Sequence, residues 1–210
     1  MYKVGFIFAI LSTLFGNSFF QNEEMVASSN VKYNILFVGN SLTYTNDLPK
    51  LVKEEAKQKG IKVSVEMLAY PNYAIEDHWN EGKVQKRIAS KNYDFVIIQQ
   101  GPSSQSEGRN MLLASGKKYR DLCQLHGAQL CYFMVWPSIN NYQTFDKVIQ
   151  NYKDAATMND AIILPVGEVW KSYIDSTNNL DYFSTDAFHP SLKGSKVAAQ
   201  VIVKYLFHNK

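Results

Sequence analysis

Five short apolar runs, separated by segments of helix length, restrict most strongly how this chain can fold. Each run is rich in β-branched and aromatic residues, and most are continuously apolar rather than alternating. Continuous apolar strands are typical of a parallel sheet covered on both faces, because both sets of side chains then point into the interior. The strands expected from these runs are YNILFV (33–38), IKVSVEML (61–68), DFVIIQ (94–99), QLCYFMV (129–135) and AIILPV (161–166).

The segments between the runs carry the periodicity of amphipathic helices. One helical face is expected from Leu48, Leu51, Val52 and Ala56, and a similar stripe near the C-terminus from Val197, Val201 and Tyr205. Strands that alternate with helices form α/β domains with right-handed crossovers. The sequence therefore predicts an α/β fold, a three-layer α/β/α sandwich with a parallel sheet of about five strands.

The N-terminus has the pattern of a secretory signal peptide. Lys3 precedes an apolar run over residues 4–15, which is too short for a membrane span, and no second hydrophobic segment follows. An uncleaved anchor is the alternative. We therefore predict a signal peptide at 1–20, a linker at 21–31 and one domain at 32–210, in a protein that is secreted or periplasmic and has no stable membrane span after cleavage.

Composition narrows the partners that the domain could have. An apolar share of 46% is enough for a sizeable core, and the net charge of +3 is spread along the chain rather than gathered into basic blocks. The sequence therefore does not indicate nucleic acid as a partner, and it leaves the oligomeric state open. Cys123 and Cys131 could pair in an exported protein, but the apolar run around Cys131 favours a buried thiol.

The turn after the first predicted strand holds a candidate nucleophile. Open parallel sheets carry their sites beyond the carboxyl ends of the strands, and Ser41 follows such a strand in a tight turn allowed by Gly39. Backbone N–H groups of such a turn can point at an oxyanion, although an ordinary turn serine or helix cap is the alternative. The same Gly-Asn-Ser triplet at 16–18 lies where the signal peptide ends, so we expect no catalytic role there.

A histidine near the C-terminus is the candidate base. His189 stands three residues after Asp186 in STDAFHPSLKGS, so that the carboxylate can hold the imidazole tautomer while the other ring nitrogen faces a serine. Pro190 restricts the backbone directly after it. An Asp and a His at this spacing also occur in solvated turns, and the pair alone is therefore a weak signal.

Together, the Gly-x-Ser turn and the Asp-x-x-His-Pro loop resemble the SGNH/GDSL hydrolase family. Its first conserved block holds a nucleophilic serine and its last holds an Asp and a His. The resemblance extends over residues 33–206 and implies a flavodoxin-like α/β/α fold with Ser41 as nucleophile, His189 as base and Asp186 as its orienting partner. The segments that look like a secreted branch of this family are GNSLTYTNDLP, IEDHWNEG, YDFVIIQQ, ILPVGEVW and DAFHPSLKGS.

The middle blocks depart from the family pattern at the groups that would bind the oxyanion. The family offers a glycine N–H after the second strand, but AYPNYAIED has no glycine, so the N–H of Asn72 or Tyr73 is the expected substitute. Where the family has an asparagine, this chain has Ser103. Some carbohydrate esterases of the superfamily carry Gln-Gly-Glu there, which favours the Gln100 amide, ahead of Gln99, as donor. The alternative is that both glutamines only satisfy nearby backbone groups.

The sequence indicates neither a metal nor another cofactor. Glu76, Asp77 and His78 are consecutive, so on a helix they point in different directions. No set of residues has zinc-ligand spacing, and no glycine-rich phosphate loop is found. Aromatic and amide side chains expected in loops would suit sugar rings, with core packing as the alternative; they are Tyr70, Tyr73, Trp79, Trp136, Asn140, Asn141 and Tyr142.

These patterns predict an exported serine esterase. It would hydrolyse short acyl esters, with acetyl as the expected group and carbohydrate as the expected acceptor, through a Ser-His-Asp triad and an acyl-enzyme. The substrate would be a small-molecule or polysaccharide ester. One alternative is a carbohydrate-binding protein of the same fold with weak or no catalysis, and another is a lipase or thioesterase that acts on longer acyl chains.

Overall fold

The structure, a computed structural model, describes Met1 and residues 32–208. The predicted signal peptide beyond Met1, the linker and the first Gly-Asn-Ser triplet lie outside the described residues. Within residues 32–208, no helix is both long enough and apolar enough to cross a membrane.

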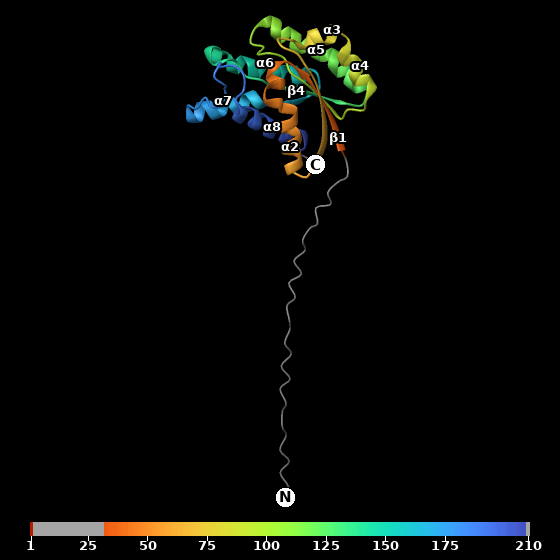
Figure 1. Cartoon of the computed structure of the whole chain (residues 1–210), viewed down its shortest axis with the longest axis vertical. Coiled ribbons are helices and arrows are strands. Elements are labelled where there is room, and N and C mark those ends of the chain that lie inside the picture. The colour runs from red at the N-terminus through yellow and green to blue at the C-terminus, as the bar shows by residue number, and fades with distance from the viewer. Residues whose placement is uncertain (2–31, 209–210) are drawn as a thin grey trace.

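Five parallel strands form a single sheet at the centre of the domain (Figure 1). Their order is β2-β1-β3-β4-β5, and in the register Phe37 stands between Met67 and Ile97. Each predicted run overlaps one strand, which confirms the predicted five-stranded parallel sheet. The strands are β1 (Lys32–Gly39), β2 (Lys62–Ala69), β3 (Phe95–Ile98), β4 (Gln129–Phe133) and β5 (Ile162–Leu164).

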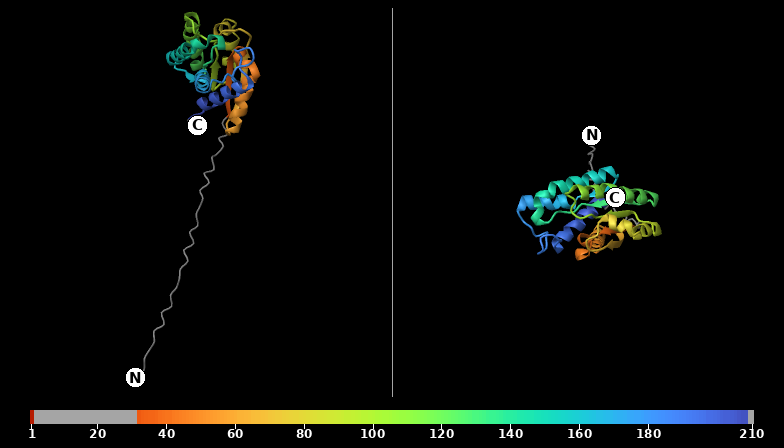
Figure 2. Two further views of the ribbon diagram at one scale, coloured as in Figure 1. Left: turned by 90° about the vertical axis from the view of Figure 1, so that its left-hand side faces the viewer. Right: turned by 90° about the horizontal axis from the view of Figure 1, so that it is seen from above.

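Helices cover both faces of this sheet and complete the predicted three-layer sandwich (Figure 2). Helices α2 and α8 pack side by side over one face, and α5 and α6 pack together over the other. The helical segments are α1 (Ser41–Tyr44), η1 (Thr45–Asp47), α2 (Leu48–Gln58), α3 (Ile75–Asn80), α4 (Lys83–Ser90), α5 (Ser106–Leu125), η2 (Ile139–Thr144), α6 (Phe145–Met158), α7 (Val166–Thr177) and α8 (Leu192–Leu206).

The core explains why the strand sequences are continuously apolar. Residues 35–38 of β1, the neighbour of both β2 and β3, have no exposed surface, as expected for a strand covered by helices on both sides. Both cysteines are free thiols buried in this core. Burial raises the pKa of Cys123 to about 12, so this thiol stays protonated and packs as a small apolar side chain.

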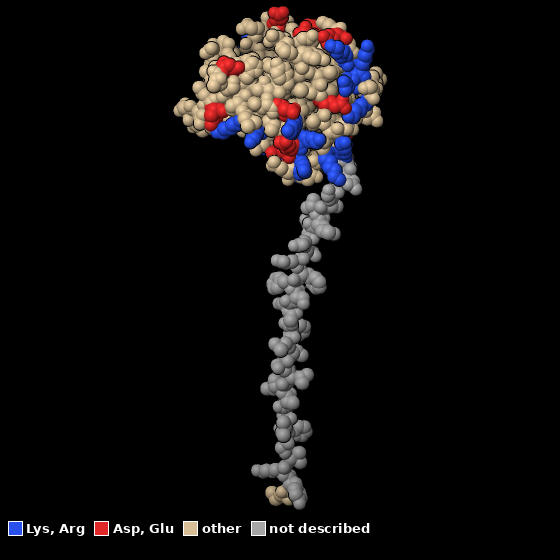
Figure 3. Space-filling model, viewed as in Figure 1, with Lys and Arg blue, Asp and Glu red and all other residues tan. Residues whose placement is uncertain are grey.

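Charged side chains are distributed unevenly over one face of the domain. In the view of Figure 3, Lys and Arg gather beside α4 and along the lower edge, next to Asp and Glu, while much of the remaining face is uncharged. The fold thus places near one another, on part of the surface, charged side chains that are spread along the sequence.

Candidate active site

The turn that carries Ser41 is built around a glycine with no room for a side chain. β1 ends at Gly39, where an added Cβ would lie 2.4 Å from Thr43 Oγ1 and 2.6 Å from Gln99 Oε1. Asn40 then caps α1, because its Oδ1 accepts the N–H of Leu42 at 3.1 Å. Close approach of neighbouring side chains therefore explains Gly39, and the backbone is not left-handed there.

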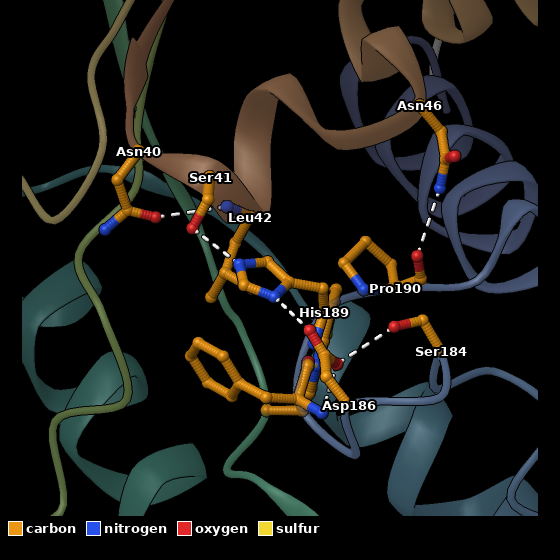
Figure 4. Close-up of polar contacts among 10 residues, drawn as sticks. Asn40, Ser41, Leu42, Asn46, Ser184, Asp186, His189 and Pro190 are labelled. Carbon is orange, nitrogen blue, oxygen red and sulfur yellow. Dashed lines mark hydrogen bonds and ion pairs between the residues drawn. The ribbon is translucent and has the colours of Figure 1, made fainter.

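Ser41, His189 and Asp186 form a continuous chain of hydrogen bonds (Figure 4). His189 Nδ1 lies 2.6 Å from Asp186 Oδ2, and His189 Nε2 lies 2.9 Å from Ser41 Oγ. Because the carboxylate accepts the Nδ1 proton, Nε2 is left to accept the Ser41 hydroxyl proton. The structure thus brings together the three side chains predicted as a triad, from positions 148 residues apart in the chain.

The Asp186 carboxylate also organises the loop that presents His189. Its Oδ1 accepts the backbone N–H groups of Phe188 and His189 and the Ser184 hydroxyl, at 2.9 to 3.0 Å. The hydrogen bond from the His189 side chain to Oδ2 contributes most, and together with the Oδ1 bonds it holds the pKa of Asp186 well below its usual range. Phe183 and Pro190 pair as an isolated antiparallel bridge, which closes the loop at its base.

The loop after β2 lies against the turn that carries Ser41. Asn40 Nδ2 donates to the Tyr73 carbonyl at 3.0 Å, and this bond ties the loop to the residue before Ser41. The Tyr73 N–H is used within the loop, where it donates to the Tyr70 carbonyl at 3.3 Å. Asn72 has φ 61°, and its backbone N–H has no hydrogen-bond acceptor within residues 32–208. Of the two N–H groups predicted as donors, the Asn72 group is therefore available.

The two glutamines at the end of β3 support backbone around the site. Gln99 Oε1 accepts the Asn40 N–H and the Thr43 hydroxyl, both at 2.9 Å, while its Nε2 is buried without a partner among the described residues. Gln100 Oε1 accepts the Ile75 N–H at 3.0 Å, and its Nε2 contacts the Met111 sulfur. These contacts fit the alternative role, because both amide oxygens accept nearby backbone N–H groups.

Two further side chains near this turn have structural contacts. Ser103, which stands where the family has an asparagine, is 2% exposed and donates to the Gly101 carbonyl at 2.9 Å. His78 Nε2 donates to the Gly39 carbonyl at 2.7 Å, and burial lowers the pKa of His78 below its usual value. His78 therefore packs beneath the turn as a neutral side chain.

The contacts by which Asn40, Thr43 and His78 support the turn around Ser41 could not be predicted from the sequence. Each side chain contacts a segment that only the folded chain brings near, and no local spacing signals such a contact.

Several aromatic residues predicted for the loops are packed instead: Trp136 is fully buried and stacks on Trp170 at 3.5 Å. In the part of the chain that the structure describes, no group of three or more His, Cys, Asp or Glu residues could hold a metal ion.

No family model and no curated protein matches the sequence. Among solved structures, it is similar to a candidate SGNH hydrolase from Slackia heliotrinireducens, at 21% identity and a TM-score of 0.71, covering 84% of this chain and 100% of that one. A variant of an acetyl xylan esterase from Geobacillus stearothermophilus matches at 13% identity and a TM-score of 0.67, covering 83% and 94%. A lipase/acylhydrolase from Enterococcus faecalis matches at 17% identity and a TM-score of 0.63, covering 82% of this chain and 94% of that one. At these identities the likeness concerns the fold alone, and this chain has the fold that solved SGNH hydrolases have.

Proposed function

We propose that this protein is a hydrolase of ester bonds that uses Ser41 as a covalent nucleophile. The observation that carries the proposal is the hydrogen-bonded chain from Ser41 through His189 to Asp186, at 2.9 and 2.6 Å. A serine paired with a base that a carboxylate orients is the arrangement of acyl transfer through an acyl-enzyme. The fold shared with SGNH hydrolases supports the same chemistry.

Each group of the candidate triad has a step in the proposed reaction. Ser41 Oγ attacks the ester carbonyl while its proton passes to His189 Nε2, and Asp186 stabilises the imidazolium that forms. The low pKa of Asp186 keeps it ionised for this role. His189 then gives the proton to the leaving alkoxide. Water, activated by His189 in turn, attacks the acyl-enzyme carbon and frees the carboxylic acid and Ser41.

Backbone donors are the best candidates for holding the oxyanion. Within residues 32–208, no hydrogen bond is found for the N–H of Ser41 itself, which begins α1, or for the N–H of Asn72. Asn40 connects the two segments through its bond to the Tyr73 carbonyl. We therefore place the oxyanion between the Ser41 and Asn72 N–H groups, with no direct part for Gln99 or Gln100.

A short acyl group on a carbohydrate is the proposed substrate. The export signal predicted from the sequence and the fold shared with an acetyl xylan esterase support it. Tyr70 and Tyr73, half-buried in the loop beside Asn40, are the aromatic side chains best placed to meet a sugar ring. A lipase or thioesterase acting on longer chains is the second candidate, favoured by the likeness to a lipase/acylhydrolase.

A catalytically weak carbohydrate-binding protein is the candidate from another class. The observation in its favour is that the side-chain donors expected here are used or buried. Gln100 Nε2 and the Ser103 hydroxyl donate to neighbouring groups, and Gln99 Nε2 is buried without a partner among the described residues. Loss of one oxyanion donor typically slows an enzyme by about a hundredfold or more. Measured activity decides between this candidate and the esterase.

The test is hydrolysis of p-nitrophenyl acetate by the protein and its variants. We expect Ser41→Ala and His189→Ala to lower kcat/KM by about a thousandfold or more, because each removes a member of the triad. The matched controls are Ser176→Ala, on the exposed face of α7, and His208→Ala, beyond α8; both should keep wild-type rates. Wild-type activity no greater than that of the triad variants would refute the proposal.

Chain length and acceptor are tested with two further substrates. An esterase of short acyl groups should prefer p-nitrophenyl acetate to the octanoate and should release acetate from acetylated polysaccharide. Preference for octanoyl or longer esters would favour the lipase or thioesterase instead.

A further inference from the structure

A side chain that the triad does not include joins the nucleophile segment to the loop of the base. Asn46 lies in η1, five residues after Ser41. Its Nδ2 donates to the Pro190 carbonyl at 3.1 Å, across 144 residues of sequence (Figure 4). It also donates to the Ser195 hydroxyl at 3.0 Å, across 149 residues. One amide group thus connects the chain just after the nucleophile to the chain just after the base.

The backbone at Asn46 aims this amide at the His189 loop. Asn46 has φ 58° and ψ 17°, and Asp47 is also left-handed at φ 52°, so the chain turns sharply between η1 and α2. Asn, Asp and Gly adopt this conformation more readily than other residues. Asp47 uses its own side chain to cap α2, by accepting the Lys50 N–H. The bridge to the His189 loop is therefore made by Asn46 and not by its neighbour.

Both acceptors of the bridge belong to the rigid support of His189. Pro190 directly follows His189, is buried and pairs with Phe183 across the loop. Ser195 is 1% exposed in the first turn of α8. A displacement of the Pro190 carbonyl would carry the His189 backbone with it, because the two residues share a peptide bond.

We propose that Asn46 is a positioning residue that sets the distance and direction of His189 Nε2 relative to Ser41 Oγ. The proposal rests on the proposed function, in which proton transfer between these two atoms is required. Asn46 touches neither reacting atom, so it acts through Pro190 and α8. Misplacement of a catalytic group by about 1 Å can cost about a hundredfold in rate, which is why a fixed bridge between two distant segments matters.

Two variants separate the effect of the Asn46 amide group from the effect of the Asn46 backbone conformation. Asn46→Gly keeps a residue that tolerates the left-handed conformation and removes the amide. Asn46→Asp keeps the shape and reverses the bond to Ser195, whose hydroxyl can donate to the carboxylate, but it sets a carboxylate oxygen against the Pro190 carbonyl. We expect kcat on p-nitrophenyl acetate to fall about tenfold to a hundredfold in both, with little change in KM and with Asp at least as impaired as Gly.

Asn178→Gly is the matched control. Asn178 has φ 55° and ψ 23°, close to Asn46, and lies exposed at the end of α7, with no side-chain hydrogen bond found in the described part of the chain. It should leave kcat unchanged. Ser195→Ala, which removes only one of the two acceptors, should give a smaller loss than Asn46→Gly. It also serves as the second variant if an Asn46 variant does not fold.

A readout without substrate keeps this inference separate from the proposed function. In a protein with ¹⁵N-labelled histidine, the His189 Nδ1 proton, assigned by its loss in His189→Ala, should exchange with water faster in Asn46→Gly than in the wild type and in Asn178→Gly. An inactive wild type would refute the proposed function, while this signal would still decide the role of Asn46. The inference would be overturned if the folded Asn46 variants had both the kcat and the proton exchange rate of the wild type, whatever their melting temperatures. If neither Asn46 variant folds, the same result in folded Ser195→Ala would overturn it.

Discussion

At the level of single residues, Asn40 shows how an amide next to Ser41 can bind two segments at once. Its Oδ1 accepts from Leu42 and its Nδ2 donates to the Tyr73 carbonyl. A carboxylate could keep the first bond but could not make the second, because an ionised Asp has no proton to donate. The requirement for Asn at this position was not visible in the sequence, since Tyr73 comes near it only in the folded chain.

Asn40→Asp should therefore weaken the hold on the loop after β2. We expect the carboxylate to repel the Tyr73 carbonyl, to shift the Asn72 N–H away from Ser41 and to lower kcat about tenfold or more on p-nitrophenyl acetate. Asn34→Asp is the control, because Asn34 makes the same kind of amide bond, to the Asn92 carbonyl at 3.1 Å, at the opposite end of β1. Equal kcat values for the two variants would contradict this role of Asn40.

At the level of elements, the strands were predictable because their burial is written in continuous apolar runs. The ends of the strands were less predictable. The last run was expected to continue to residue 166, but β5 stops at Leu164 and Pro165 caps α7, since proline has no N–H for the sheet. The order β2-β1-β3-β4-β5 is that of the flavodoxin-like fold which the family resemblance implied. The apolar runs alone do not give this order, because it depends on which strand packs beside which after the crossovers.

One ionised group joins the edge strand β2 to the end of α4. Glu66 accepts from Lys91 at 2.5 Å, from Tyr93 at 2.8 Å and from Arg87 at 2.7 Å. These bonds, with Lys91 and Tyr93 contributing most, lower the pKa of Glu66 to about 2. A lowered carboxyl pKa means that the stabilisation is complete above the unfolded pKa of about 4.3 and is lost as pH falls toward 2.

Glu66→Gln should remove that acid-sensitive contribution. We expect the free energy of unfolding to fall by about 1 kcal/mol at pH 7, with the difference from wild type shrinking between about pH 4.3 and 2. Urea unfolding at several pH values measures it. Glu168→Gln, in an exposed pair with Lys153, is the control and should change stability little. A difference that is the same at pH 7 and pH 2 would show that the loss has another cause.

At the level of the whole molecule, the fold brings a turn near the start of the domain to a loop near its end. The candidate triad could be predicted because Ser41 follows a buried strand and Asp186 and His189 share one short motif. The oxyanion groups could not, because the state of Asn72, Gln99 and Gln100 depends on contacts among three loops. The structure gives both glutamine amides backbone partners and leaves the Asn72 N–H without one in the described chain.

The central claim, that Ser41 is a nucleophile activated by His189, is tested most directly by reaction with a fluorophosphonate and mapping of the adduct by mass spectrometry. Ser41 Oγ would bond to phosphorus, fluoride would leave and the hydroxyl proton would pass to His189. We predict one adduct on Ser41, none in Ser41→Ala, and labelling slowed about a hundredfold or more in His189→Ala. An adduct on another residue, or Ser41 labelling at the wild-type rate without His189, would contradict the account.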